Sequence, residues 1–230
     1  MDALTQTVLN CHELGVTELN RALRALPEGS SALVVEPRGA HNIGVGMTTQ
    51  VDITVDGNAG YYLAGLCDGP SFVVNGSVGW GAGENLMRGT VRIKGNASES
   101  AGATAHGGLL IVEGDASLRC GISLKGGDIA VAGNVGNMAA FMAQAGSILV
   151  GGNAGDSLGD SLYEAVIYVG GTVKSLGADA KISDLTPEDV AKVRELIDAS
   201  GFTHIDPENV TKVSSAKTLY NFDALKNQRY

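Results

Sequence analysis

The 230-residue chain is poor in the residue types that mark several large classes of protein. Its 3 cysteines, Cys11, Cys67 and Cys120, are an odd number without a Cys-x-x-Cys pair, so we expect neither a disulfide framework nor a zinc or iron–sulfur site. Only 18% of the residues are charged and the net charge is −9 without a basic cluster, which argues against nucleic acid and anionic membranes as partners. The sequence shows no apolar run of transmembrane length and no signal peptide, so we expect a cytoplasmic protein.

Glycine, by contrast, is abundant, and part of it is strictly periodic. Seven of the 33 glycines lie 19 residues apart, at Gly57, Gly76, Gly95, Gly114, Gly133, Gly152 and Gly171. Each stands in a similar phrase, such as Ile-Thr-Val-Asp-Gly-Asn-Ala-Gly from Ile53 and Ile-Leu-Val-Gly-Gly-Asn-Ala-Gly from Ile148. A fixed period of this length indicates one supersecondary unit stacked on copies of itself.

The aligned phrases give columns of one residue type. The first column holds Ile53, Phe72, Val91, Leu110, Ile129, Ile148 and Ile167, and the third holds Val55, Val74, Ile93, Val112, Val131, Val150 and Val169. Two apolar columns around a mixed one (Thr54, Val73, Arg92, Ile111, Ala130, Leu149 and Tyr168) describe a short strand with one buried face. The glycine ends that strand, and the polar residue after it suits a turn that needs positive φ.

These columns predict an all-β solenoid, a right-handed parallel β-helix of about seven 19-residue coils. Each coil is expected to hold about three short strand-like runs joined by tight bends. Like columns then lie about 4.8 Å apart, which gives a prism roughly 30 Å long. Left-handed hexapeptide helices need three equal sides, which a 19-residue coil with one glycine corner does not provide.

The repeat divides the chain into three parts: residues 1–31, an N-terminal helical segment; residues 32–180, the β-helix; and residues 181–230, a C-terminal helix with an extended, partner-docking tail. In the first part we predict a short amphipathic helix over 17–26 with Thr17 as N-cap. In the last part Thr186 and Pro187 start a helix and Gly201 ends it. The final thirty residues look irregular.

The search for chemistry finds no nucleophile, base and orienting group at a recognisable spacing. The histidines are His12, His41, His106 and His204, and no two of them share a repeat column. The Cys11-His12 pair alone is weak evidence for a thiolate nucleophile. Residues 79–83, Gly-Trp-Gly-Ala-Gly, are not followed by the helix that a dinucleotide fingerprint requires, so we interpret them as a coil corner. We therefore predict no catalytic, cofactor-binding or metal-ligating residue on this chain.

Aromatic residues outside the aliphatic columns are the candidates for a partner interface. Trp80 and the pair Tyr61-Tyr62 follow turn glycines, and His41 lies near the start of the stack. The tail adds further aromatic residues that belong to no column of the repeat. The candidate interface residues are Leu219, Tyr220, Phe222, Trp80 and His41.

The coils resemble a known family. The Gly-Asn-Ala/Val-Gly corners and the literal Gly79-x-Gly-x-Gly83 resemble the GXGXG β-helix domain at the C-terminal end of the glutamate synthase large subunit, over about residues 32–180. The Leu-Thr-Pro-Glu-Asp-Val helix start and the Ser-Ala-Lys-Thr-Leu-Tyr-Asn-Phe tail are similar to stand-alone β-helix subunits of glutamate-synthase-like complexes. Among these, the chain looks most like the β-helix subunit of N-methylglutamate synthase, an enzyme of methylamine metabolism.

This resemblance implies a scaffold subunit of a hetero-oligomeric oxidoreductase-type complex. Its partners would be a class II glutamine amidotransferase-like chain and an FMN-dependent synthase-like chain with an iron–sulfur cluster, so the cofactors are expected on a partner and none on this chain. The complex would exchange methylamine for the amino group of glutamate. The chain has no catalytic cysteine at its second position, no synthase barrel and no cysteine cluster, so no active site carries over.

Two alternatives remain open. The β-helix subunit of a formylmethanofuran dehydrogenase or formyltransferase/hydrolase complex shares the coil signature, and a metallohydrolase-like rather than a glutaminase-like neighbouring gene would favour it. A free-standing β-helix enzyme acting on saccharides or acyl groups would carry a charged groove or a coil-facing histidine, and the sequence shows neither.

Overall fold

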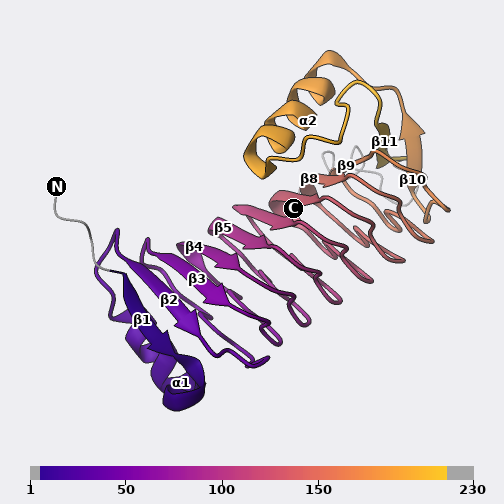
Figure 1. The fold of residues 1–230 in the computed structure, drawn as a ribbon. Coiled ribbons are helices and arrows are strands. Elements are labelled where there is room, and N and C mark those ends of the chain that lie inside the picture. Colours follow the sequence, from indigo (N-terminus) through magenta and orange to yellow (C-terminus); the bar gives the residue numbers. More distant parts are fainter. Residues whose placement is uncertain (1–5, 217–230) are drawn as a thin grey trace, which may run out of the picture.

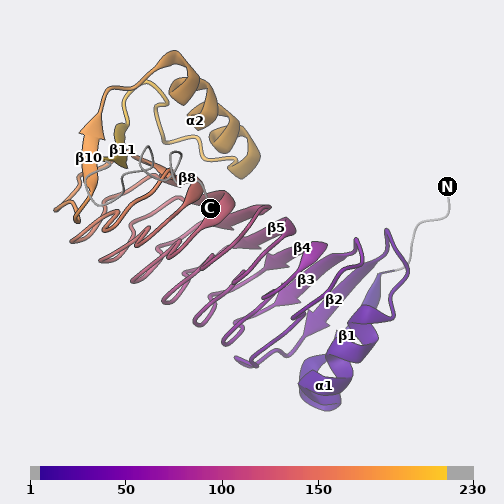
Figure 2. The ribbon, with the colours of Figure 1, turned by 180° about the vertical axis from the view of Figure 1, so that it is seen from behind.

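A computed structural model describes residues 6–216. The strands are β1 (Thr7–Asn10), β2 (Ser31–Val35), β3 (Asp52–Asp56), β4 (Asp68–Val74), β5 (Arg88–Ile93), β6 (Leu109–Val112), β7 (Lys125–Val131), β8 (Ala145–Val150), β9 (Val166–Val169), β10 (Ala180–Ser183) and β11 (Thr211–Ser215). The helices are α1 (Cys11–Arg24) and α2 (Pro187–Ser200). Strands β1 to β9 stack in chain order along one rod, with α1 at one end and α2 near the other (Figures 1 and 2). The predicted parallel β-solenoid of about seven turns with two helices is confirmed.

The strands pair in the register that the sequence period predicts. Ile53 is opposite Phe72, Phe72 is opposite Val91, and the same column continues through each parallel pair to β9. Side chains of this column are at most 2% exposed, so the column faces the interior. The core is therefore a stack of like aliphatic side chains, with each rung of the solenoid covering the one before it.

Each coil contains fewer strands than the sequence predicts. Besides its one strand it has a single-residue bridge, such as Ala59 with Val78, and a segment of turns. In that segment alternate residues take positive φ, for example Tyr62 at 58°, Ala64 at 54° and Leu66 at 59°. The alternation points backbone N–H groups to both neighbouring rungs, so the turns are hydrogen-bonded without forming strands.

The corner glycines are required by close approach between rungs. Gly114 N–H donates to the carbonyl oxygen of Gly95 at 3.1 Å, and a Cβ on Gly114 would lie 2.8 Å from that same oxygen. The polar residue after each corner does not take positive φ, contrary to expectation; instead the side chains from Asn58 to Asn153 accept from the next rung. The Asn96 side-chain oxygen, for example, accepts from Asp115 N–H at 2.8 Å. The series of hydrogen bonds between successive rungs runs through Asn58, Ser77, Asn96, Asp115, Asn134, Asn153 and Thr172.

From residue 6 onward, the first element of the N-terminal segment is a strand and not a helix. Strand β1 pairs in parallel with β2, so the solenoid starts within the residues that the sequence pattern assigns to a helical segment. Helix α1 then begins at Cys11, where Asn10 caps it by accepting from Glu13 N–H at 3.2 Å. The predicted N-cap Thr17 lies inside this helix. Four strand residues are too few to show a period, and only pairing with β2 defines them as a strand.

Helix α1 closes the N-terminal end of the core. Gly15, at φ 71° and ψ 157°, kinks the helix, and the part after it carries the amphipathic pattern that the sequence predicts. Leu19 and Leu23 are fully buried and belong to the same apolar cluster as the inward columns of the rungs. The helix thus covers side chains that no preceding coil covers.

The C-terminal end closes in a way that the sequence shows only in part. Helix α2 has the predicted caps: Thr186 accepts from Asp189 N–H at 3.3 Å, and Gly201 ends the helix at φ 77°. The region beyond it is not irregular throughout, since β11 pairs antiparallel with β9, and β10 pairs antiparallel with β11. Val213 of β11 is fully buried. Antiparallel strands therefore end the parallel stack.

Candidate functional site

Three rings stack on the outer surface of the first rungs and form what we term the aromatic ladder: His41, Tyr61 and Trp80. The rings of His41 and Tyr61 are 4.1 Å apart and 8° from parallel, and those of Tyr61 and Trp80 are 5.3 Å apart at 21°. Tyr61 N–H also donates to His41 Nδ1 at 2.9 Å, which fixes the first step of the stack. The structure thus brings together two predicted interface residues, His41 and Trp80, through a third.

The repeat itself positions this stack. Tyr61 and Trp80 are one period apart, so the solenoid places them in one column on consecutive rungs. Tyr61 accepts from Asn42 N–H at 2.7 Å, which ties its backbone to the rung before it. The 19-residue spacing of Tyr61 and Trp80 in the sequence indicates that their rings lie on neighbouring rungs. The contribution of His41 could not be read from the spacing, because its separation from Tyr61 differs from one period.

A half-open hollow of about 290 Å³ lies on the same rungs. It is lined by Asn42, Val45, Tyr62, Gly65, Leu66, Glu84 and Asn85. Tyr62 is 45% exposed and Leu66 57%, so two large apolar side chains face solvent here. Partial burial raises the pKa of the Glu84 carboxyl group. The surface is therefore apolar, aromatic and acidic at once.

Leu219, Tyr220 and Phe222, the other predicted interface residues, lie outside the described residues, and their role stays a prediction.

The cysteines and histidines do not assemble a reactive site. The three thiols are free and buried, and burial raises the pKa of Cys67 to about 11 and that of Cys120 to about 12. Burial also raises the pKa of Cys11, while the adjacent His12 is exposed, so this pair lacks the electropositive setting of a thiolate nucleophile. Within residues 6–216, no group of three or more His, Cys, Asp or Glu side chains is placed to hold a metal ion.

A second surface of the solenoid is covered by its own C-terminal segment. In the mixed column of the strands, Ile111, Ala130, Leu149 and Tyr168 are buried. They pack against Val193 and Leu196 of α2 and against Phe202 and Ile205 after it. Thr54, Val73 and Arg92 of the same column are only partly buried. Helix α2 therefore packs on the apolar half of this mixed column.

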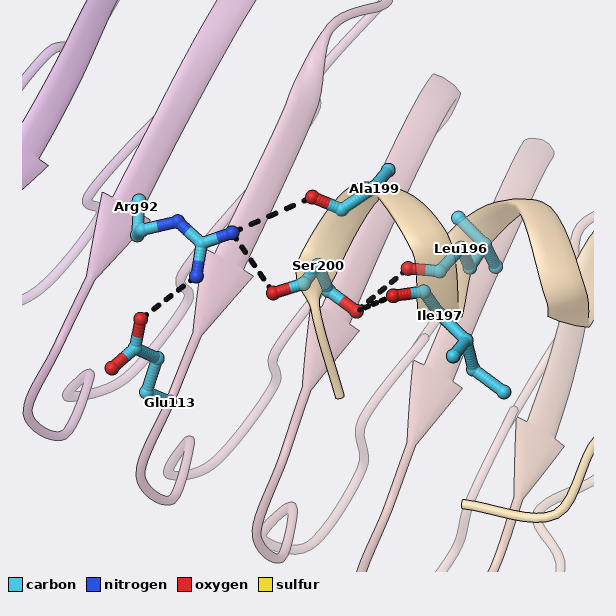
Figure 3. Close-up of polar contacts among 6 residues, drawn as sticks. All are labelled: Arg92, Glu113, Leu196, Ile197, Ala199 and Ser200. Atoms are coloured by element: carbon cyan, nitrogen blue, oxygen red, sulfur yellow. Dashed lines mark hydrogen bonds and ion pairs between the residues drawn. The ribbon is translucent and has the colours of Figure 1, made fainter. Parts of the chain in front are cut away.

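Arg92 lies at the boundary between the covered and the open half. Figure 3 shows its guanidinium between the Glu113 carboxylate and the last carbonyl groups of α2. Arg92 Nη2 donates to the Ser200 carbonyl oxygen at 2.9 Å and to that of Ala199 at 3.4 Å, and Nη1 lies 2.7 Å from Glu113 Oε1. A cation at this position is favoured by the negative end of the helix dipole.

A buried carboxylate holds the other end of α2. Asp189 accepts from the Tyr168 hydroxyl at 2.8 Å and from Lys212 Nζ at 2.6 Å, and so joins α2 to β9 and β11. Burial by itself raises the pKa of Asp189, but the bonds from Lys212, the Thr186 amide and Tyr168 outweigh it and lower the pKa to about 2. Burial and the neighbouring carboxylate raise the pKa of Tyr168. No pattern in the sequence indicates this contact, since its members come from three separate elements.

Neither helix within residues 6–216 combines the length and the apolar character needed to cross a bilayer. No protein-family model matches the chain, and no solved structure matches it. A search of known proteins finds Protein GlxC of Rhizobium meliloti (strain 1021), which is 53% identical over 209 residues. The match covers 90% of this chain and 92% of that protein.

Proposed function

The chain belongs to the GlxC family, and from this membership we propose that it is a non-catalytic docking subunit of a glutamate-synthase-type complex. One observation carries the proposal: the aromatic ladder stands exposed on a rod whose interior is filled by aliphatic columns. Exposed Trp and Tyr side chains are typical centres of protein interfaces. The resemblance of residues 32–180 to the GXGXG β-helix of glutamate synthase supplies the kind of complex.

In this proposal the rod joins two catalytic chains. One is a class II glutamine amidotransferase-like chain, and the other is an FMN-dependent synthase-like chain that carries FMN and an iron–sulfur cluster. The reaction is that of N-methylglutamate synthase, in which methylamine and glutamate give N-methylglutamate and ammonia. The complex is a cytoplasmic hetero-oligomer. This chain fixes the distance and orientation between the two catalytic chains.

Co-expression with an amidotransferase-like chain and a synthase-like chain from the same genome tests the proposal. We expect the three chains to co-purify, and the complex to form N-methylglutamate from methylamine and glutamate while this chain alone does not. Turnover by the isolated chain, or failure of all three chains to associate, would sink the proposal. Association without methylamine transfer would leave a docking subunit with a different substrate.

The role of the tail needs a deletion that spares the fold. Removing residues 203–230 would also remove β11 and the buried Ile205 and Val213, so lost binding would not isolate the tail. Removing residues 217–230 leaves every described element in place. We expect this shorter deletion to weaken co-purification, because Leu219, Tyr220 and Phe222 are proposed to lie on a partner. Unchanged co-purification would remove the tail from the interface.

A further inference from the structure

Within the described part of the chain, the exposed Tyr and Trp residues gather at one place. The exposed Tyr and Trp side chains within residues 6–216 all stand on two consecutive rungs: Tyr61 is 43% exposed, Tyr62 45% and Trp80 51%. Trp80 is the single tryptophan of the chain. We define these three residues with Glu84 and Glu99 as the aromatic–acidic patch. Such clustering on a chain with 5% aromatic residues marks a surface that association would cover.

The acidic members of the patch stand on the rungs of Trp80 and of its next neighbour. Glu99 follows Trp80 by one period, so it stands on the next rung of the same column, where its carbonyl oxygen accepts from Gly81 N–H at 3.0 Å. A Cβ on Gly81 would lie 2.9 Å from Glu84 Oε2 and 2.9 Å from Tyr62 Cδ1. The Glu84 carboxylate and the Tyr62 ring therefore converge on the space that this glycine leaves open.

Neither carboxylate is neutralised within the described part of the chain. Several acidic side chains pair with Arg or Lys, as Glu113 does with Arg92, but no ion pair in residues 6–216 includes Glu84 or Glu99. The guanidinium of Arg24 donates to the carbonyl oxygen of Val45, a residue that lines the hollow. The patch thus offers negative charge, partly shielded from water, beside open aromatic faces.

This combination of groups selects a particular ligand chemistry. A guanidinium group stacks on Trp and Tyr faces and donates a fork of hydrogen bonds to a carboxylate. Small-molecule sites are clefts that enclose most of the ligand, whereas this hollow is half open and the rings of Tyr61 and Trp80 beside it are 43% and 51% exposed. An extended protein segment fits such a surface better than a small cation does. The net charge of −9 also attracts a cationic partner.

We propose that the aromatic–acidic patch binds an arginine-bearing segment of a partner chain, with the guanidinium stacked on Trp80 and paired with Glu84 or Glu99. The inference rests on the proposed function, because that function supplies the partner chains. It assigns a contact surface and a partner chemistry that the proposed function leaves open.

The single tryptophan allows a direct test. The chain is labelled with 5-fluorotryptophan, so that Trp80 gives one ¹⁹F resonance, and is mixed with the unlabelled amidotransferase-like and synthase-like chains. Complex formation is followed separately by size-exclusion chromatography. We expect the resonance to shift when the complex forms. A complex that forms without a change at Trp80 overturns the patch but leaves the proposed function standing, whereas no complex at all contradicts the proposed function.

The arginine chemistry is tested on the chain alone. A hexa-arginine peptide is the probe and a hexa-citrulline peptide is its neutral control, because citrulline keeps the shape of the side chain without its charge. We expect only hexa-arginine to shift the Trp80 resonance, and the shift to weaken with added salt. Equal shifts with both peptides, or no shift with either, overturn the inference whatever the partner chains do.

Substitutions complete the test. Trp80→Ala, and Glu84→Gln combined with Glu99→Gln, should each weaken the complex by roughly tenfold or more, as the loss of a central interface contact does. Met87→Ala is the matched control, because Met87 is 43% exposed and lies outside the patch. We expect its affinity to stay within about twofold of the parent chain. Each variant must keep the parent Tm, and equal weakening by Met87→Ala would contradict the assignment to the patch.

Discussion

From Gly95 onward, each corner glycine lies over the corner glycine of the preceding rung and is bonded to it directly. The Gly133 N–H donates to Gly114 at 3.0 Å, and the Gly152 N–H donates to Gly133 at 2.8 Å. The corner leaves no room for a side chain, because a Cβ there would meet the preceding rung: on Gly133 it would lie 2.8 Å from the Gly114 carbonyl oxygen. The strict recurrence of glycine is thus a consequence of close packing between rungs.

Gly114→Val should destabilise the rod by about 3 kcal/mol, since overpacking against a backbone carbonyl cannot be relieved by a side-chain rotation. For a chain of this size that is a fall in Tm of roughly 6–12 °C, measured by circular dichroism. Gly39→Ala is the control: at φ 73° with no atom within 4 Å of its Cβ position, it carries only the strain of a left-handed residue, about 1 kcal/mol. An unchanged Tm for Gly114→Val would contradict the column assignment.

The three thiols should be inert toward an aromatic disulfide reagent at pH 8 while the protein is folded. The thiolate is the reactive form, and burial raises the pKa of Cys67 to about 11 and that of Cys120 to about 12. Cys11 is 3% exposed and is shielded in the same way. Absorbance of the released thiol, in buffer and then in guanidinium chloride, measures this. A thiol that reacts rapidly in the folded chain would contradict the packing of its rung.

At the scale of elements, α2 is held to the solenoid by an apolar face and by a polar contact at each end. The apolar face of α2 packs on Leu149 and its neighbours in the mixed column of the strands. Arg92 binds the last carbonyl groups of the helix, and Asp189 binds Tyr168 and Lys212 near its first turn. The polar contacts fix where along the rod the helix sits, because the apolar column alone would allow it to slide.

The docking of α2 should weaken in acid through Asp189. Folding lowers the pKa of this carboxyl group from 3.8 to about 2, so its contribution is present above about pH 4 and is lost as the pH falls through about 2. The loss should be about 2 kcal/mol. Amide hydrogen-exchange protection of residues 187–200, followed from pH 5 to pH 2, measures it.

Two variants, one at Asp189 and one control, test whether Asp189 causes this pH dependence. Asp189→Asn should lower the protection already at pH 5 and remove this part of its pH dependence. Asp198→Asn, at an exposed position of the same helix, should leave the pH dependence as it is in the parent chain. If Asp189→Asn and the parent chain lose protection in parallel as the pH falls, Asp189 is not the group responsible.

At the scale of the whole molecule, the rod needs covers at both ends. Leu19 and Leu23 of α1 cover the first rung, and β11 and β10 pair beyond the last parallel strand. An uncovered parallel edge would offer free backbone groups and aliphatic side chains to another copy. The two flanking segments therefore keep the stack finite, as terminal segments of repeat proteins do.

Deletion of residues 184–230 should convert the chain into a self-associating species. The deletion exposes the edge of β9 and uncovers Ile111, Leu149 and Tyr168 on the outer face. Light scattering after size-exclusion chromatography should show assemblies larger than those of the full chain. Deletion of residues 217–230 is the control and should leave the mass distribution of the full chain. A truncated chain with unchanged mass would mean that the C-terminal segment is not a cap.

Some of the site was within reach of the sequence. The spacing of Tyr61 and Trp80 placed them in one column, and side chains one period apart in a solenoid are close by construction. His41 and the hollow beside Tyr62 depend on how the irregular first coil meets the second, and no period describes that contact. Strands β1 and β11 were missed for a similar reason, since short segments gain their strand character from the neighbours with which they pair.

The sequence by itself determined the register of the rungs, the inward columns and the caps of α2. These features repeat or depend on neighbours within a few residues, so the spacing of Gly57 to Gly171 already contains them. Only the tertiary structure decided which half of the mixed column α2 covers, how the ends of the rod close, and where exposed rings meet the carboxylates of the patch. Those contacts join residues far apart in the chain, and their energies depend on distances that sequence spacing does not encode.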